Sequence, residues 1–418
     1  MKKLLSLSLL FFGIFALNAQ TVFRTQTLAP NIRTLQAHLN GDPFALPILT
    51  LNGDDVLHIQ FDEMSHEFRS FSYRVFKANA DWTVSALNPA EYLRGFSTGM
   101  ITESHTSMGT IHNFTNYRLT IPNADMNFLK SGNYVLEVFE DGRQDRPVLR
   151  VAFSVVEPRV SISATIRGNT DTEINRRMQQ LDFEINTEGF PVNDPQNELR
   201  VVVRQNNRTD NEVRGITPTF IRGNVLSFIN NRALIFEGGN EYHSFDVSSV
   251  HSGANNVEHI RRTRTRIDAF LFPNASQPPS NYVFRPDANG RFIINLQGGY
   301  FDKATEADYV YVHFTLPRAQ PFSDGDVFLG GEFNHNLMNE ASQMQFDPEQ
   351  RAYVKTLLLK QGGYNYQFWF RPRGSQRANV ERIDGSFWQT RNEYTIFVYH
   401  RAWGERHDRL IGVKTVEN

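Results

Sequence analysis

Alternation of apolar and polar residues with a period of two is the feature that most limits what this chain can fold into. Successive side chains of a β-strand point to opposite faces of the sheet, so this period predicts half-buried strands. Short turns rich in Gly and Asn separate the strands, and this spacing is typical of sandwiches or barrels. We therefore expect an all-β fold with two or three antiparallel β-sandwich domains, immunoglobulin-like or early-set-like, in tandem. The clearest alternating runs are 57–61, 117–121, 181–185 and 364–370.

The N-terminus has the pattern of a secretory signal peptide. Lys2 and Lys3 precede an apolar run at 4–17, and Ala19 supplies a small residue before the cleavage point. The run is shorter than the ~20 residues that a membrane-spanning helix needs. We expect residues 1–19 to be removed and the chain to be exported. No second apolar span follows, so no helix is expected to cross a membrane.

Composition excludes several classes of function. The chain contains no Cys, so it has no disulfide, no Cys-based metal site and no lipoprotein anchor. Loss of Lys2 and Lys3 would change the formal net charge from −2 to −4. A nearly neutral chain lacks the strongly basic character typical of nucleic-acid binding, so we expect no nucleic-acid partner.

Three domains are expected after the signal peptide. An apolar strand ends at Glu157-Pro158, which predicts the first boundary. The Pro-rich stretch at 273–280 reads as a linker or long loop, and the apolar run at 309–317 reads as the first core strand of a last sandwich. The predicted organisation is a signal peptide, a first β-sandwich, a second β domain and an early-set-like β-sandwich, at 1–19, 20–157, 158–300 and 301–418.

Catalytic and metal-binding motifs are weak in this sequence. Ser97 lies in a Gly-x-Ser-x-Gly pattern, but that motif needs a strand-to-helix turn above a parallel sheet, and the flanking residues here predict no such turn. The 12 His residues show no zinc-binding spacing. We expect no enzyme activity, no cofactor and no metal, with a hydrolase using Ser97 as the reading to test.

The sharpest run of charge is Arg261–Arg266. If it forms a strand, Arg262, Arg264 and Arg266 share one face and make a positive stripe suited to a carboxylate-rich partner. The competing interpretation is a solvated edge, which charge protects from aggregation.

The last predicted domain resembles the early-set sandwiches of glycogen- and starch-binding modules. The segments that carry this resemblance are 326–334, 344–347 and 353–368. Those modules carry a Trp just past the Phe-Asn to stack on sugar rings, whereas His335 and Asn336 follow Phe333-Asn334 here. The resemblance therefore predicts the fold more strongly than glycan binding. Trp388 and Trp403 are expected to pack in or beside strands.

A second resemblance covers nearly the whole mature chain. The strand at 71–75 runs into an Asn-Ala-Asp-Trp turn, and further short motifs follow in a fixed order. Taken together, they resemble the plug proteins of the Bacteroidetes type IX secretion system. The residues of this motif set that are expected to be structural or to contact a partner are Asn79, Asp81, Trp82, Ser85, Glu91, Tyr92, Gly95, Ser131, Gly132, Asn133, Tyr134, Gln205, Asn206, Gly239, Asn240 and Glu241.

This resemblance implies a periplasmic plug at the inner side of the outer membrane. Its partner would be the giant outer-membrane β-barrel of the secretion system, whose periplasmic end the plug would seal sterically when no cargo passes. Such a plug would be monomeric within the complex and would need no cofactor. The alternative is a periplasmic or surface glycan-binding protein, based on the early-set resemblance.

Overall fold

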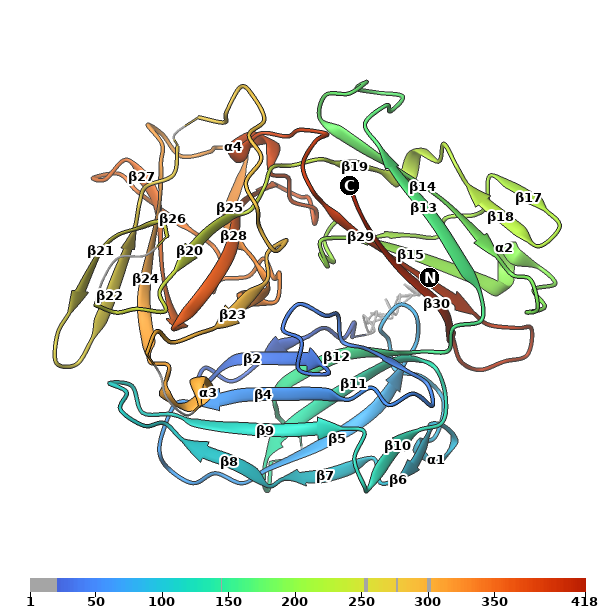
Figure 1. Ribbon diagram of the computed structural model, residues 1–418, viewed down its shortest axis with the longest axis horizontal. Coiled ribbons are helices and arrows are strands. Elements are labelled where there is room, and N and C mark those ends of the chain that lie inside the picture. Colours follow the sequence, from blue (N-terminus) through green and yellow to red (C-terminus); the bar gives the residue numbers. More distant parts are fainter. Residues whose placement is uncertain (1–20, 144, 252–254, 276, 299–301) are drawn as a thin grey trace, which may run out of the picture.

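The computed structural model describes residues 21–418 except 144, 252–254, 276 and 299–301, so the predicted signal peptide at 1–19 lies outside the described residues. The chain forms three β-sandwiches arranged around a common centre (Figure 1). In the described part of the chain each α-helix has four residues. The predicted all-β fold of tandem sandwiches is confirmed.

The first sandwich has two antiparallel layers that enclose a core of alternating side chains. In the smaller layer, Leu57, Ile59 and Phe61 are buried on one strand, as the period of two predicts. The parallel pairing of β3 with β12 is an exception to the antiparallel pattern. One sheet contains β1 (Gln26–Thr27), β3 (Ile48–Thr50), β5 (Phe71–Ala78), β7 (Thr98–Ile101), β11 (Gly132–Glu140) and β12 (Pro147–Val156). The facing sheet contains β2 (Ile32–Leu39), β4 (Leu57–Glu63), β8 (Glu103–Thr106) and β9 (Thr115–Ile121). At one end lie α1 (Pro89–Tyr92), β6 (Leu93–Gly95) and β10 (Met126–Phe128).

The second sandwich is built from two separate parts of the chain. Its core joins Phe183 and Val203 from the middle of the sequence to Ile396 and Ile411 from the C-terminus. One sheet contains β13 (Ser161–Arg167), β14 (Met178–Asn186), β17 (Phe220–Arg222), β18 (Val225–Phe228) and β19 (Ile235–Glu237). The other contains β15 (Leu199–Gln205), β16 (Val213–Arg214), β29 (Glu393–His400) and β30 (Arg409–Glu417). The short helices are α2 (Pro195–Glu198) and η1 (Arg232–Leu234).

The third sandwich lies between these two parts in the sequence. Aromatic rings fill its core, where Phe245 stacks on Tyr364 at 5.1 Å and Tyr364 stacks on Phe292 at 5.3 Å. One sheet contains β20 (His243–Asp246), β23 (Phe292–Ile294), β25 (Gly325–Gly330) and β28 (Gly362–Pro372). The other contains β21 (Val257–Arg262), β22 (Ile267–Leu271), β24 (Tyr309–Pro317), β26 (Gln345–Asp347) and β27 (Ala352–Lys360). The short helices are α3 (Lys303–Glu306), α4 (Glu381–Asp384) and η2 (Glu332–Asn334).

Strand pairing contradicts the predicted boundary near 300. The β29 strand pairs with β15, so the C-terminal hairpin completes the second sandwich rather than a domain at 301–418. The β20 strand pairs with β28, so residues from 243 onward already belong to the third sandwich. The described residues of the Pro-rich stretch at 273–280 lie in a loop between β22 and β23. Local composition identified the loop, but pairing between distant strands decides which sheet a strand joins.

Candidate functional site: the junctions between the sandwiches

The Asn-Ala-Asp-Trp motif forms a tight turn at the end of β5. The Trp82 amide donates to the Asn79 carbonyl at 2.9 Å, and the Asn79 amide donates to the Thr83 carbonyl at 2.8 Å. The Asp81 carboxylate accepts from the Thr83 amide at 3.1 Å, as expected for an Asp in a turn. Trp82 has a left-handed backbone with φ of 64° and is 6% exposed. A bulky residue at positive φ is uncommon and persists only where its surroundings hold it there.

The second sandwich supplies those surroundings through Asp408. One carboxylate oxygen accepts from the Ala80 amide at 2.8 Å, within the turn. The same carboxylate pairs with Arg200 at 2.5 Å and Arg401 at 2.8 Å. The Arg204 guanidinium lies 5.7 Å from the centre of the Trp82 ring. The turn therefore docks the first sandwich onto the second.

The Ser131-Gly132-Asn133-Tyr134 motif docks on the same side. The Tyr399 hydroxyl of β29 donates to Asn133 Oδ1 at 2.9 Å. Ser131 donates to Glu157 at 2.8 Å, and Glu157 also accepts from both Nε and Nη2 of Arg409, at 2.7 and 2.9 Å. These bonds connect the motif to the C-terminal hairpin of the second sandwich.

Lys77 explains why this motif contains a glycine. Its ammonium donates to the Ser131 carbonyl at 2.5 Å and lies 4.7 Å from the Tyr134 ring centre. A Cβ at Gly132 would come within 2.3 Å of the Lys77 Nζ and 2.6 Å of the Asp408 carbonyl oxygen. Burial lowers the pKa of Lys77 to about 7.

The remaining motif residues of the first sandwich shape the segment around α1. The Glu91 carboxylate accepts from the Asn88 amide at 2.8 Å and caps α1. Tyr92 packs edge-on against Tyr134, and the Ser85 amide donates to the Lys77 carbonyl at 3.0 Å. Gly95 has φ of 91°, and a Cβ there would meet the Asp125 carbonyl oxygen at 2.0 Å, so the position requires glycine.

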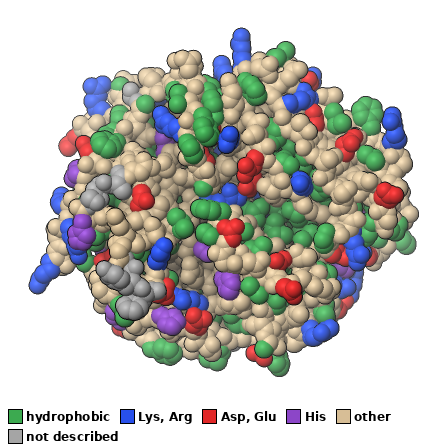
Figure 2. All heavy atoms as spheres, viewed as in Figure 1, with side chains coloured by type: hydrophobic (Ala, Val, Ile, Leu, Met, Phe, Trp, Pro, Cys, Tyr) green, Lys and Arg blue, Asp and Glu red, His purple; other side chains and the backbone are tan. Residues whose placement is uncertain are grey.

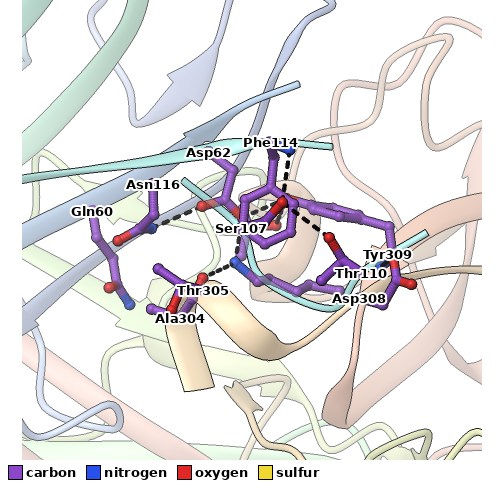
Figure 3. Close-up of polar contacts among 12 residues, drawn as sticks. Gln60, Asp62, Ser107, Thr110, Phe114, Asn116, Ala304, Thr305, Asp308 and Tyr309 are labelled. Carbon is purple, nitrogen blue, oxygen red and sulfur yellow. Dashed lines mark hydrogen bonds and ion pairs between the residues drawn. The ribbon is translucent and has the colours of Figure 1, made fainter. Parts of the chain in front are cut away.

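The junction between the first and third sandwiches is a buried polar cluster around Asp62 (Figure 3). Asp62 accepts from Asn116 at 2.8 Å on its own sandwich and from the Tyr309 hydroxyl at 2.7 Å on the third. It also pairs with the Lys360 ammonium at 2.5 Å. The Lys360 ammonium lies 4.0 Å from the Phe114 ring centre, an arrangement that favours the cation. Desolvation nevertheless lowers the pKa of Lys360, and it raises that of Tyr309.

The second and third sandwiches meet at the remaining motifs. Gln205 ends β15 and Asn206 follows it, and Asn206 Oδ1 accepts from the Glu393 amide at 2.9 Å. Glu393 in turn pairs with Arg291 of the third sandwich at 2.8 Å. Beside them, Arg208 lies 4.2 Å from the Trp369 ring centre. The motif residues therefore connect the two sandwiches indirectly, through the groups that they orient.

Gly239, Asn240 and Glu241 form the crossing from β19 to β20. The Gly239 amide donates to Ser386 Oγ at 3.0 Å, and Asn240 Nδ2 donates to the Asp384 carbonyl at 2.7 Å. Glu241 accepts from the Tyr282 hydroxyl. The contacts with Asp384 and Ser386 fix the crossing to the segment that leads to β29, and the contact with Tyr282 fixes it to the loop between β22 and β23.

The predicted arginine stripe is wrong as a strand face. The β21 strand ends at Arg262, and Arg264 is exposed in the turn that follows. Arg266 turns back to pair with Asp268 at 2.7 Å and to lie 3.9 Å from the Tyr311 ring centre. The run forms a hairpin tip because its Thr263 and Arg266 backbones bond across a turn.

Other chemical candidates from the sequence do not assemble into a site. Ser97 lies between β6 and β7, so it lacks the strand-to-helix turn of the hydrolase motif. Trp403 was expected to pack, but it is 97% exposed. Within the described ranges no group of three or more His, Asp or Glu side chains is placed to hold a metal ion. None of the helices in the described part of the chain is long and apolar enough to cross a bilayer.

Nothing in the sequence indicated that Asp62, Tyr309, Lys360 and Asp408 meet at junctions. Tyr309 and Lys360 lie in the segments 309–317 and 353–368 that were expected to form the last sandwich, but their junction partner, Asp62, lies more than two hundred positions away. Asp408 likewise lies more than three hundred positions from Ala80. Asn116, by contrast, lies next to the predicted strand at 117–121, whose alternation indicated a sheet but not the junction. Only strand pairing brings these groups together.

The family model described as the type 9 secretion system plug protein 1st domain matches residues 32–157. This chain belongs to the type IX secretion system plug protein family. The matched range covers most of the first sandwich, including the Asn79–Trp82 and Ser131–Tyr134 motifs. Membership of the plug family gives the chain a role related to type IX secretion.

A solved structure extends the comparison to the whole chain. The crystal structure of a hypothetical protein from Parabacteroides merdae ATCC 43184 is 41% identical, with a TM-score of 0.93. The match covers 96% of this plug-family chain and 100% of the other. The search of curated proteins gave no significant match. The arrangement of the three sandwiches is thus shared by two chains that differ at most positions.

Proposed function

We propose that this chain is a periplasmic plug that closes the periplasmic end of the giant outer-membrane translocon barrel of type IX secretion when no cargo passes. The observation that carries the proposal is the joining of three sandwiches into one body by buried polar contacts. A stopper works by steric exclusion, so it needs rigidity rather than a reactive group. The chain would act as a monomer within the complex, without a cofactor.

The junctions contain buried charged and polar groups that lose their partners if the sandwiches separate. Asp62 and Lys360 each expose 1% of their side chains, and breaking such a pair leaves an unpaired buried charge. The shared arrangement in a chain of 41% identity supports the same view, since flexible domains rarely keep one orientation.

Trp403 is the best candidate for a contact with the barrel. It is 97% exposed on the loop between β29 and β30. The loop is held at both ends, because Arg401 pairs with Asp408 and Arg406 pairs with Glu91. An exposed Trp on a fixed loop is preorganised for binding, and interface hot spots are enriched in Trp and Arg.

Capture of the barrel from detergent-solubilised envelope tests the proposal. We expect the tagged chain to co-purify with a very large outer-membrane β-barrel, and deletion of its gene to raise permeability to large antibiotics. Unchanged permeability together with no captured barrel would refute the plug function.

Two variants locate the contact. Trp403→Ala should weaken capture about tenfold or more, which is the scale of a binding hot spot. Phe220→Ala is the matched control, because Phe220 is an exposed aromatic on the second sandwich at 68% exposure. Equal capture by both variants would reject Trp403 as the contact without rejecting the plug function.

The glycan-binding alternative stays a prediction with a simple test. His335, which stands where a stacking Trp is usual, is half-buried, and its burial lowers its pKa. It offers no exposed platform for a sugar ring. Retention of the chain on a starch or glycogen affinity gel would support the alternative.

A further inference from the structure

A cleft of about 590 Å³ lies on the third sandwich, along the loop between β22 and β23. The rest of its lining comes from the start of β20, the segment before β21 and the end of α4 (Figure 1). Sites for small molecules usually measure roughly 300–1,000 Å³, so this cleft is large enough for one.

Amide side chains are the most frequent group in this lining. They are Asn240, Asn255, Asn256, Asn274, Gln277 and Asn281. Each amide offers two donors and an acceptor, whereas most small-molecule sites are lined mainly by apolar groups. The lining therefore indicates a ligand that carries many hydrogen-bonding groups.

The carboxylates of the lining are already bonded within the protein. Asp384 is buried and pairs with His243 at 3.0 Å. Glu241 is 5% exposed and accepts from the Tyr282 hydroxyl. Arg285 is exposed and forms no ion pair within the described residues, and its guanidinium N–H groups can also donate to uncharged oxygens. Figure 2 likewise shows acidic and basic side chains scattered over the visible face rather than gathered by sign.

Hydrogen bonds hold the polar side of the cleft in place. The Tyr366 hydroxyl donates to Asn274 Oδ1 at 3.0 Å, and Asn274 Nδ2 lies 3.2 Å from His243 Nδ1. Asn256 Nδ2 donates to the same Tyr366 hydroxyl at 3.4 Å, while its Oδ1 has no partner among the described residues. A site that is already ordered loses less conformational entropy when it binds a ligand.

An exposed aromatic ring lies beside these amides. Phe272 is 51% exposed, and its backbone amide donates to the Asn256 carbonyl at 3.2 Å, so the two residues are neighbours in the lining. Val283, which is 60% exposed, adds apolar surface from the same loop. An aromatic face next to hydrogen-bonding groups suits a ligand that has one apolar face and a polar edge.

We propose that this cleft binds a saccharide, whose ring packs its C–H face on Phe272 while its hydroxyls bond to Asn256, Asn281 and Arg285. A sugar ring combines a face of C–H groups with a rim of hydroxyls, and each hydroxyl both donates and accepts, as amides require. The cleft does not include His335, the position where the early-set modules carry their stacking Trp. The proposal does not depend on the plug function.

Saturation-transfer NMR with maltose, cellobiose and N,N′-diacetylchitobiose tests this site on the whole chain. We expect saturable binding of at least one of the three disaccharides. Transfer should be largest to ring C–H protons, because these would contact Phe272. Binding of none of them, or transfer confined to protons outside the rings, would overturn the proposal.

Variants of the lining locate the bound sugar. Phe272→Ala should weaken binding roughly tenfold through the lost ring contact, and Asn281→Ala roughly threefold or more through a lost hydrogen bond. Phe68→Ala is the matched control, because Phe68 is an aromatic of 83% exposure between β4 and β5 of the first sandwich. It should bind as the wild type does. Unchanged affinity in both lining variants would overturn the proposal.

Two matched ligands identify what the cleft recognises. Sorbitol has the hydroxyls of a sugar without its ring, and cyclohexanol has a ring with a single hydroxyl. Each should bind at least about tenfold more weakly than the disaccharide that binds, since each lacks one half of the recognised pattern. Equal binding of either compound would overturn the saccharide assignment.

Discussion

The first sandwich is held on its two sides by different chemistry. Toward the second sandwich, Asp408 pairs with two arginines whose side chains are 48% and 26% exposed. An apolar cluster backs these pairs: Ala80, Val202, Phe397, Tyr399 and Leu410. Toward the third sandwich, Asp62 and Lys360 form a buried ion pair with 1% exposure on each side, and Arg118 and Asp302 form a second pair that is 28% and 36% exposed.

This difference indicates that the two junctions contribute differently to the stability and to the orientation of the first sandwich. Either arginine of the first–second junction can be lost at modest cost, because its side chain is partly exposed, water can replace it and the other arginine still pairs with Asp408. A fully buried pair gains little net stability, yet losing one partner is costly. We expect the first–second junction to supply most of the adhesion and the first–third junction to set the orientation.

The largest effect should follow Asp62→Ala. It leaves the Lys360 ammonium buried without its partner, which costs about 3–5 kcal/mol. Urea unfolding should show this loss in the free energy of unfolding. The double variant Asp62→Leu with Lys360→Met should recover most of it, and a double variant as unstable as Asp62→Ala would contradict our account of the buried pair.

Gly132→Ala probes the other side of the comparison. The new Cβ would meet Lys77 and the Asp408 backbone at a glycine with φ of 125°, so we expect a loss of about 1–3 kcal/mol. Gly142→Ala is the control, since Gly142 has φ of 79° but open space around it. Equal thermal shifts for the two variants would mean that the close approach does not matter.

Lys77 makes the first–second junction sensitive to pH. Its pKa is about 7 in the folded protein and 10.5 ordinarily, so between these values the unfolded chain binds more protons. Stability should therefore rise from pH 7 to 9, by at most about 1.4 kcal/mol for each pH unit from this group. The pKa of Lys360 is lowered too and adds in the same direction. Chemical denaturation across this range should give a smaller slope for Lys77→Met, and an unchanged slope would exclude Lys77 as a source.

The smallest effect is expected for Arg406→Ala. The Arg406 side chain is 58% exposed and that of its partner Glu91 is 33% exposed. Surface pairs of this kind contribute about 0–1 kcal/mol, and salt screens them. A loss above about 2 kcal/mol in urea unfolding would show that this edge of the junction matters more than its exposure indicates.

Local pattern predicted the strands better than their assembly. Alternation identified the strands at 57–61 and 364–370 because a strand with one buried face alternates apolar with polar residues along its own sequence. The Asn and Asp residues of the motif at 79–82 predicted a turn. The pairing of β15 with β29, about two hundred residues apart, left no local trace, because the hydrogen bonds between them involve only backbone groups.

The candidate sites show the same limit. The plug motifs could be recognised as short segments of the sequence, but Asp408, the partner of the Asn-Ala-Asp-Trp turn, could not. The Asp62–Lys360 pair also left no sign in the sequence. His335 was noted only as a departure from a stacking Trp, and the cleft of the third sandwich is lined by distant segments that only folding brings together. The charge pattern placed Arg264 on a strand face, whereas it lies in the turn after β21. Alternation within 261–266 does not show at which residue the hairpin turns.

The split second sandwich imposes an order on biogenesis. Ribosomes release the N-terminal end first, so residues 21–157 can collapse early while the middle body still lacks β29 and β30. Those strands, β29 (Glu393–His400) and β30 (Arg409–Glu417), follow every strand of the third sandwich in the described part of the chain. A prematurely terminated product would keep a sheet with an open edge, a ready target for proteases and quality control. The second sandwich, and with it the ring of three bodies, is complete only once β29 has paired with β15.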